Sequence, residues 1–225
     1  MAFAEEIDRA QGVSGELVLR RGPAGLEIVA NGVFLVSAAN AASSRALVAA
    51  AWSCVGSDLR VLIGGLGIGD ALDEALGCPR VASVTVVELE PQIVRWFRDH
   101  GGERARRARA AELAGRARIV VADVAELLAE ATEPWDVVAL DTDNGPEWLV
   151  RGENARLYAP AGLCVVHAAL RPGGVAVFWS PDTYPSFEGD LRDVFADVRT
   201  VAAVDVIDGR PLEYTMYVAR RADGG

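Results

Sequence analysis

The sequence predicts an α/β fold: a seven-stranded, mostly parallel, doubly wound sheet with an antiparallel last strand, preceded by a small N-terminal β-hairpin element. Three observations predict it. From residue 60 onward, continuously apolar segments alternate with helix-like segments, which is typical of a parallel sheet covered on both faces. Glycines crowd the first turn from strand to helix. The last two apolar segments are joined by a turn too short for a crossover, so the last strand should run antiparallel.

The first expected element is a set of short strands ahead of the main domain. Apolar segments flank a glycine- and proline-containing turn at 21–25, and another follows the hairpin signal Asn31-Gly32. The expected strands are 17–19, 26–29 and 32–36. An alanine-rich segment at 40–53 then predicts a helix with Asn40 or Ser43 as its cap.

The main domain is expected to begin after this hairpin element. Residues 1–39 are assigned to the hairpin element and residues 40–225 to the main domain. Apolar segments predict parallel strands at 60–64, 83–88, 117–122, 137–141 and 174–180. Helices are expected at 69–76, 91–100, 124–131, 161–170 and 187–195. The final strands are expected at 198–206 and 213–220.

Composition limits the function classes. With 225 residues and 51% hydrophobic content, the chain can bury a sizeable core, yet no apolar run is long enough to span a membrane. The N-terminus lacks a secretory signal, and the three scattered cysteines fit reduced thiols and a cytoplasmic location. No cysteine pair has metal-type spacing, so no metal is expected.

Charge disfavours a nucleic-acid partner. The net charge of −10 would repel phosphates, and the arginines between residues 104 and 118 are interrupted by Glu103 and Glu112, so a solvated helix face is expected there. All 22 basic residues are arginine, which excludes Schiff-base chemistry and the P-loop lysine.

The most informative motif is the first strand and the turn that follows it. Gly65, Gly67 and Gly69 leave no Cβ atoms in the turn, so a ligand can lie against backbone and the N–H groups of a helix start. The next strand ends at Glu88, where a carboxylate suits the two hydroxyls of a ribose. The sequence therefore predicts nucleoside binding.

Several motifs carry a resemblance to a known family. The strand order, the glycine turn and Leu170-Arg171-Pro172-Gly173-Gly174 resemble the class I S-adenosylmethionine-dependent methyltransferase fold, a Rossmann-like fold. The hairpin ending in Asn31-Gly32-Val33-Phe34, the Val87-Glu88-Leu89-Glu90 segment and the 141–146 stretch resemble spermidine synthases and their spermidine-synthase-like relatives more closely. The resemblance runs from about residue 15 to residue 220.

The resemblance implies roles for particular residues. The glycine turn would wrap the methionine part of the nucleoside, Glu88 would take the ribose and Asp123 would receive the adenine amino group, although Asp123 also suits a helix cap. The implied cofactor-binding residues are Gly65, Leu66, Gly67, Gly69, Glu88, Leu89, Asp123, Val124 and Asp141. The candidate catalytic residues are Asp141, Asp143 and Asn144. Trp148 and Trp179 are candidates for stacking on a flat ligand, with core packing as the alternative.

Three differences separate the chain from aminopropyl-transferring members of that family. Ile68 stands where those enzymes carry an Asp in the glycine loop, and Asn144 stands where they carry a second transfer-site Asp. Residues 38–44 include neither an acid nor a tyrosine, which the family uses to hold the polyamine. Because a polyamine needs carboxylates for its proton and its ammonium charges, ordinary spermidine synthesis is disfavoured.

The leading hypothesis is a transferase that moves a methyl group from S-adenosylmethionine to a small-molecule acceptor, with Asp141 as polar anchor and Asp143 as base. The alternatives are a polyamine aminopropyltransferase that uses decarboxylated S-adenosylmethionine in a rebuilt amine site, and a non-catalytic nucleoside-binding homologue. A nicotinamide-dependent dehydrogenase fits less well, because the glycine spacing departs from G-x-G-x-x-G. A homodimer through the N-terminal hairpin is also an expectation.

Overall fold

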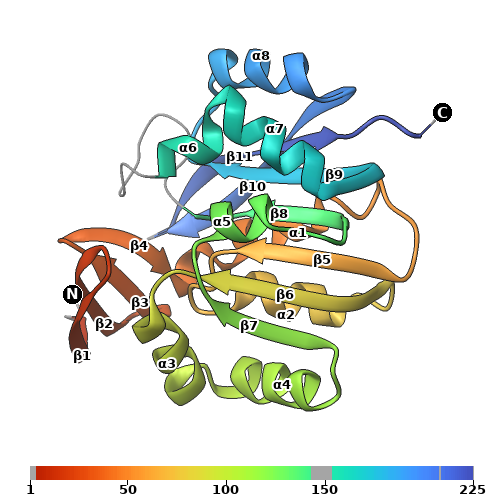
Figure 1. Cartoon of the computed structure of the whole chain (residues 1–225). Helices are drawn as coiled ribbons and strands as arrows, with labels where there is room; N and C mark the ends of the chain where they lie inside the picture. Colours follow the sequence, from red (N-terminus) through yellow and green to blue (C-terminus); the bar gives the residue numbers. More distant parts are fainter. Residues whose placement is uncertain (1–3, 143–153, 208, 225) are drawn as a thin grey trace.

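The computed structural model describes residues 4–142, 154–207 and 209–224. They form two sheets, a four-stranded antiparallel sheet at the N-terminus and a seven-stranded sheet with helices on both faces (Figure 1). The predicted α/β class is confirmed.

The N-terminal sheet is larger than the expected hairpin element. Its strands pair in chain order: β1 (Glu5–Gly12), β2 (Gly15–Gly22), β3 (Gly25–Ala30) and β4 (Val33–Ser37). Strand β1 was not predicted, because its residues are mostly polar and exposed. Its Asp8 accepts a 2.7 Å hydrogen bond from the indole N–H of Trp96, which joins the sheet to the main domain. Asn31 supplies the expected turn with φ 50°, and its side-chain oxygen accepts from the Glu16 N–H.

The seven-stranded sheet has the order β10-β11-β9-β8-β5-β6-β7. Its strands are β5 (Leu59–Gly64), β6 (Val81–Glu88), β7 (Ala117–Val121), β8 (Trp135–Leu140), β9 (Leu170–Ser180), β10 (Asp197–Ile207) and β11 (Arg210–Arg220). Strands β5 to β9 pair in parallel, whereas β11 lies antiparallel between β9 and β10. The predicted antiparallel last strand is confirmed.

Helices cover both faces of this sheet and enclose two hydrophobic clusters. Residues of the first four helices join one cluster with the N-terminal sheet, and residues of the last four join the other. The helices are α1 (Ala41–Ala49), α2 (Asp70–Gly77), α3 (Pro91–His100), α4 (Gly102–Leu113), α5 (Val124–Ala129), α6 (Ala155–Tyr158), α7 (Pro160–Ala169) and α8 (Pro185–Val194).

The start of α1 differs from the prediction. A 3-10 turn, η1 (Ala38–Asn40), precedes the helix, and neither Asn40 nor Ser43 caps it with a side chain. The cap comes from β10 instead. The buried Asp205 carboxylate accepts hydrogen bonds from the N–H groups of Ala42 at 2.9 Å and Ser43 at 3.1 Å. An acceptor from a distant strand satisfies the free donors of a helix start as well as a local side chain does.

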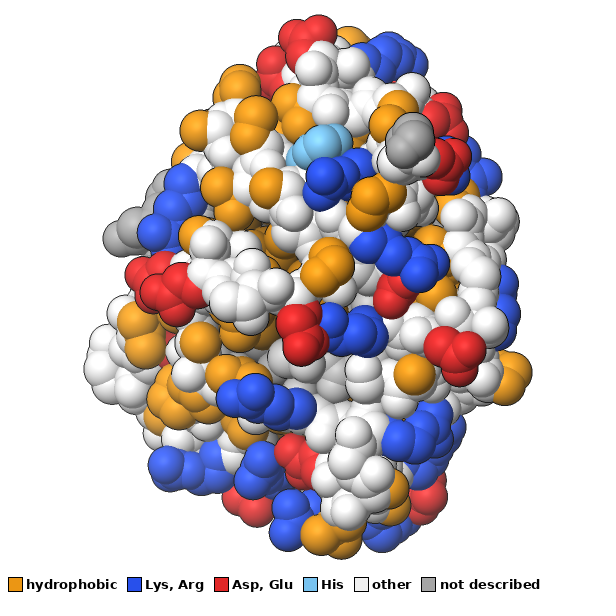
Figure 2. All heavy atoms as spheres, turned by 45° about the vertical axis from the view of Figure 1, so that its right-hand side comes forward, with side chains coloured by type: hydrophobic (Ala, Val, Ile, Leu, Met, Phe, Trp, Pro, Cys, Tyr) orange, Lys and Arg blue, Asp and Glu red, His pale blue; other side chains and the backbone are white. Residues whose placement is uncertain are grey.

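The arginine-rich segment forms α4, whose arginines are paired with acids. Arg104 and Arg107 contact Asp70 and Asp73 of α2 at 2.9 and 2.7 Å, and Arg106 contacts Glu103 at 2.6 Å. On the face in Figure 2, basic and acidic side chains are interspersed. None of the helices in the described ranges is long and apolar enough to cross a membrane.

Candidate functional site

A cavity of about 1250 Å³ opens at the carboxyl ends of the parallel strands, which is where ligands bind in open α/β sheets. Its two halves come from different parts of the chain. The glycine-loop half is lined by Gly65, Leu66, Gly67, Ile68, Glu88, Leu89, Asp123 and Val124. The β4–β10 half is lined by Val33, Phe34, Leu35, Val36, Ser44, Trp179, Pro181, Val206, Ile207 and Tyr214. Asp141 lies on the lining between β5 and β9, since it follows β8.

The glycine turn needs glycine for conformation and for space. Gly65, Gly67 and Gly69 have φ values of 96°, 51° and 88°, a region that other residues rarely adopt. A Cβ on Gly65 would lie 2.2 Å from the Asp141 carbonyl oxygen, and one on Gly67 would lie 3.3 Å from Val36 of β4. Gly69 then begins α2. The turn therefore presents bare backbone to the cavity, as a ligand cradle requires.

Glu88 is held rigidly at the end of β6. Its side chain is buried, and its two carboxylate oxygens accept hydrogen bonds from the N–H groups of Leu66 at 2.8 Å and Glu90 at 2.9 Å. Burial raises the pKa of this carboxyl group, while those backbone donors oppose the rise. A carboxylate has about four lone-pair sites, so Glu88 keeps acceptor capacity for a sugar hydroxyl in the cavity.

Asp123 has two protein partners. Its carboxylate accepts a 2.9 Å hydrogen bond from the Ala125 N–H and so caps α5, and it also pairs with Arg156. The helix-cap role considered from the sequence is therefore present. Asp123 lines the cavity as well, so the implied contact with an adenine amino group stays a prediction.

Asp141 lines the cavity directly after β8. Its N–H donates to the Gly64 carbonyl at 2.8 Å, which fixes the backbone after β8. Burial raises the pKa of the Asp141 carboxyl group to about 6, opposed by a hydrogen bond from the Ser44 side chain and assisted by the Glu88 charge. A carboxylate with a pKa near the working pH is suited to accept a proton. Asp143, Asn144 and Trp148 lie outside the described residues.

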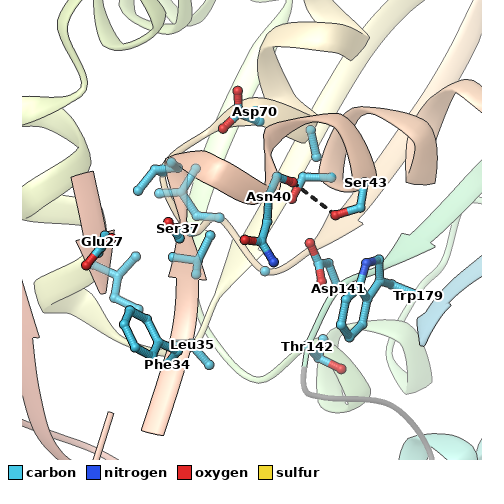
Figure 3. Close-up of a pocket in the computed structure, with 18 of the residues that line it drawn as sticks. Glu27, Phe34, Leu35, Ser37, Asn40, Ser43, Asp70, Asp141, Thr142 and Trp179 are labelled. Atoms are coloured by element: carbon cyan, nitrogen blue, oxygen red, sulfur yellow. Dashed lines mark hydrogen bonds between the residues drawn. The ribbon is translucent and has the colours of Figure 1, made fainter. Parts of the chain in front are cut away.

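Trp179 stands directly beside Asp141 in the sheet. The parallel register pairs Leu140 with Phe178, so the next residues of the two strands are neighbours (Figure 3). The Trp179 ring lies 5.1 Å from the Tyr214 ring, and the Tyr214 hydroxyl accepts a 3.0 Å hydrogen bond from the Asn40 side chain. The sequence pointed to Trp179 but missed Asn40, Ser44, Val206 and Tyr214. Val206 and Tyr214 lie at the ends of expected strands, whereas Asn40 and Ser44 lie in the expected 40–53 helix and carry no signal of a site.

Ile68 is 4% exposed, and its side chain packs in the hydrophobic cluster that includes the N-terminal sheet. The acid that follows the turn, Asp70, is also buried, and it is paired with Arg45 and Arg104 at 3.0 and 2.9 Å. Residues 64–69 carry no charged side chain. The absence of an acid in the turn therefore holds for every position of the loop, not only for residue 68.

Within residues 4–142, 154–207 and 209–224, no group of three or more His, Cys, Asp or Glu side chains is arranged to hold a metal ion.

The fold is that of spermidine synthases. A spermidine synthase in complex with the transition-state analogue AdoDATO aligns with a TM-score of 0.81 at 18% identity, covering 98% of this chain and 75% of that one. The spermidine synthase from Thermotoga maritima aligns with a TM-score of 0.79 at 17% identity, covering 98% and 73% of the two chains. These enzymes have the class I methyltransferase-like fold, so the predicted resemblance is confirmed at the level of the fold. No family model and no curated protein matches the sequence.

Proposed function

We propose that this chain is a group transferase whose cosubstrate is an S-adenosyl sulfonium nucleoside. The observation that carries the proposal is Glu88. Its buried carboxylate is fixed by two backbone donors beside the glycine turn and faces a cavity that Asp141 also lines. This combination supplies a ribose acceptor, a backbone cradle and a proton acceptor at one sheet edge.

The chain's own residues would bind and orient the nucleoside and remove a proton from the acceptor. When bound, the sulfonium nucleoside supplies a carbon atom already activated for transfer. Glu88 and the turn from Gly65 to Gly69 would hold the nucleoside, and Asp123 would orient its base. Asp141 would accept the proton of the incoming acceptor. Alignment of the acceptor atom with the activated carbon is then the main catalytic requirement.

Two candidate reactions differ in the group transferred. Methyl transfer from S-adenosylmethionine is favoured by the uncharged 64–69 turn, because a helix start without a nearby free acid suits the carboxylate of that nucleoside. Aminopropyl transfer from the decarboxylated nucleoside is favoured by the comparisons, since both structural neighbours are spermidine synthases. The comparisons thus give the second candidate the stronger support.

Calorimetry with both nucleosides separates the candidates. The proposal expects one nucleoside to bind and Glu88→Ala to weaken it by about tenfold or more, since a hydrogen bond to a charged group is lost. Glu103→Ala, at an exposed position of α4, is the matched control. Preference for S-adenosylmethionine supports methyl transfer, and preference for the decarboxylated form supports aminopropyl transfer. Binding without turnover of any acceptor would identify a non-catalytic homologue, and binding of neither nucleoside would overturn the proposal.

The remaining expectations belong to the same proposal. We place the protein in the cytoplasm, because all three cysteines are free. A homodimer through the N-terminal sheet is supported by its exposed apolar residues, such as Val13 at 60% exposure. Sedimentation at micromolar concentration tests it, and a monomer would exclude it.

A further inference from the structure

The β4–β10 half of the cavity differs chemically from the glycine-loop half. Most of its lining side chains are apolar, and they come from three strands: Val33, Phe34 and Leu35 from β4, Trp179 from β9, and Val206 and Ile207 from β10. Val33, Phe34 and Val206 are large apolar side chains left 38%, 53% and 64% exposed at this rim. Exposed apolar side chains gathered at a cavity mark a binding surface rather than a packed core.

The cavity has room for two ligands. Single ligand pockets usually enclose about 300–1,000 Å³. At about 1250 Å³, this cavity can accept a nucleoside against the glycine turn and still leave space against β4 and β10. Whatever fills that space lies against Val, Phe and Ile side chains, so most of its own surface must be apolar.

Among the residues that the structure describes, this half offers one place for a positive charge. Glu27 also lines it, but the Glu27 carboxylate is already paired with Arg20 at 2.8 Å. Asp141 also lies beside this half. Among the described lining residues there, its carboxylate is the one that makes no ion pair with an arginine. The adjacent Trp179 adds an aromatic face, and a carboxylate beside an indole suits a single ammonium group.

We propose that the β4–β10 half binds the acceptor of the transfer reaction, and that this acceptor is a monoamine with an apolar body rather than a polyamine. The inference rests on the proposed function. A polyamine would have to leave its second ammonium group against Val206, Ile207 or Phe34, where the one described lining carboxylate, Glu27, is already paired with Arg20.

The transfer step follows from this placement. The amine loses a proton to the Asp141 carboxylate and its nitrogen lone pair forms a bond to the carbon carried by the sulfonium. The carbon–sulfur bond breaks, and its electron pair stays on sulfur as a neutral thioether. The products are a substituted ammonium ion, a thioether nucleoside and a protonated Asp141, which returns its proton to water.

Equilibrium dialysis with tryptamine and putrescine, each in the presence of S-adenosylhomocysteine, tests the proposal. Wild-type protein should bind the aromatic monoamine at least about tenfold more tightly than the aliphatic diamine. Val206→Glu places a carboxylate where the second ammonium group would lie, so the preference for tryptamine should shrink by about tenfold. Val204→Glu, at an exposed valine two positions away on β10 that does not line the cavity, should leave the preference unchanged.

The outcomes separate the acceptor proposal from the transferase proposal. Equal or tighter binding of putrescine by wild-type protein overturns the monoamine assignment. A change of sedimentation in Val206→Glu without a change in amine preference also overturns it, because the rim would then be an interface between copies. Tryptamine binding without any binding of S-adenosylhomocysteine supports the amine site and overturns the transferase.

Discussion

Glu90 holds Val13 to the main domain: its carboxylate accepts a 2.7 Å hydrogen bond from the Val13 N–H, and its other oxygen accepts one of 2.7 Å from Ser14. Glu90 lies just after β6 and is only 4% exposed. The β1–β2 turn is thus attached next to Glu88. The position of the N-terminal sheet over the cavity depends on this side chain.

Replacement of Glu90 should therefore loosen the N-terminal sheet. Glu90→Ala leaves two backbone donors unpaired, and we expect it to lower the free energy of unfolding by about 2 kcal/mol, with Glu90→Gln costing about half of that. Urea denaturation measures both. Glu103→Ala removes an exposed ion pair with Arg106 and should cost less than about 0.5 kcal/mol. Equal stability of all three variants would contradict the proposed attachment.

The glycine turn should not tolerate a methyl group at Gly65. The residue has φ 96°, and an added Cβ would lie 2.2 Å from the Asp141 carbonyl. Gly65→Ala should cost more than about 2 kcal/mol of unfolding free energy, because it combines a disfavoured conformation with a clash. Gly56→Ala is the control, since a Cβ there meets no atom within 4 Å. Thermal denaturation measures both variants. Equal melting temperatures would mean that the turn adjusts to the added methyl group, and the prediction would be wrong.

The pH dependence of stability reports on Asp141. Burial raises the pKa of its carboxyl group from 3.8 to about 6 in the folded state. Its contribution to stability is therefore full below pH 4 and is lost as the pH rises through 6. Asp141→Asn cannot ionise, so between pH 4.5 and 7.5 its unfolding free energy should rise relative to wild type by about 2 kcal/mol. Asp99→Asn, at an exposed site of α3, controls for the lost charge. Parallel stability curves for Asp141→Asn and wild type would disprove the raised pKa.

Asp123→Ser separates the two roles considered for Asp123. Serine caps a helix as well as aspartate does, so the variant should lose less than about 1 kcal/mol of unfolding free energy, mainly from the exposed Arg156 pair. If Asp123 also accepts the adenine amino group, calorimetry should show nucleoside affinity lower by about tenfold or more. Unchanged affinity would leave Asp123 as a helix cap alone.

The inner strands of the central sheet could be predicted from the sequence because β5, β8 and most of β9 are buried on both faces. The apolar run 61–63 is unambiguous because the glycine turn and a helix follow it, and the run 84–87, interrupted only by Thr85, is followed by the helix that starts at Pro91. Strand β1 could not, because its polar residues show no clear alternation, and α4 was expected only as a solvated helix face without bounds, because its polar residues show no helical stripe. The glycine-loop half of the cavity was predicted for the same reason as the sheet: its residues lie directly after strand ends.

The β4–β10 half could not be predicted in this way. Asn40 contacts Tyr214 across 174 positions, and the cap of α1 comes from Asp205 across 162 or more. No local pattern in either segment indicates the other. Their proximity follows from the insertion of β11 between β9 and β10, which brings the end of β10 over the N-terminal region.

These long separations also bear on the order in which the cavity assembles. Leu66 and Glu88 are 22 positions apart, whereas Asp205 and Ser43 are 162 apart. Closing a longer loop costs more chain entropy, and distant pairings slow folding. The nucleoside cradle should therefore form before β10 docks on α1. Amine binding would then require that β10 has already docked on α1, the later of these two steps.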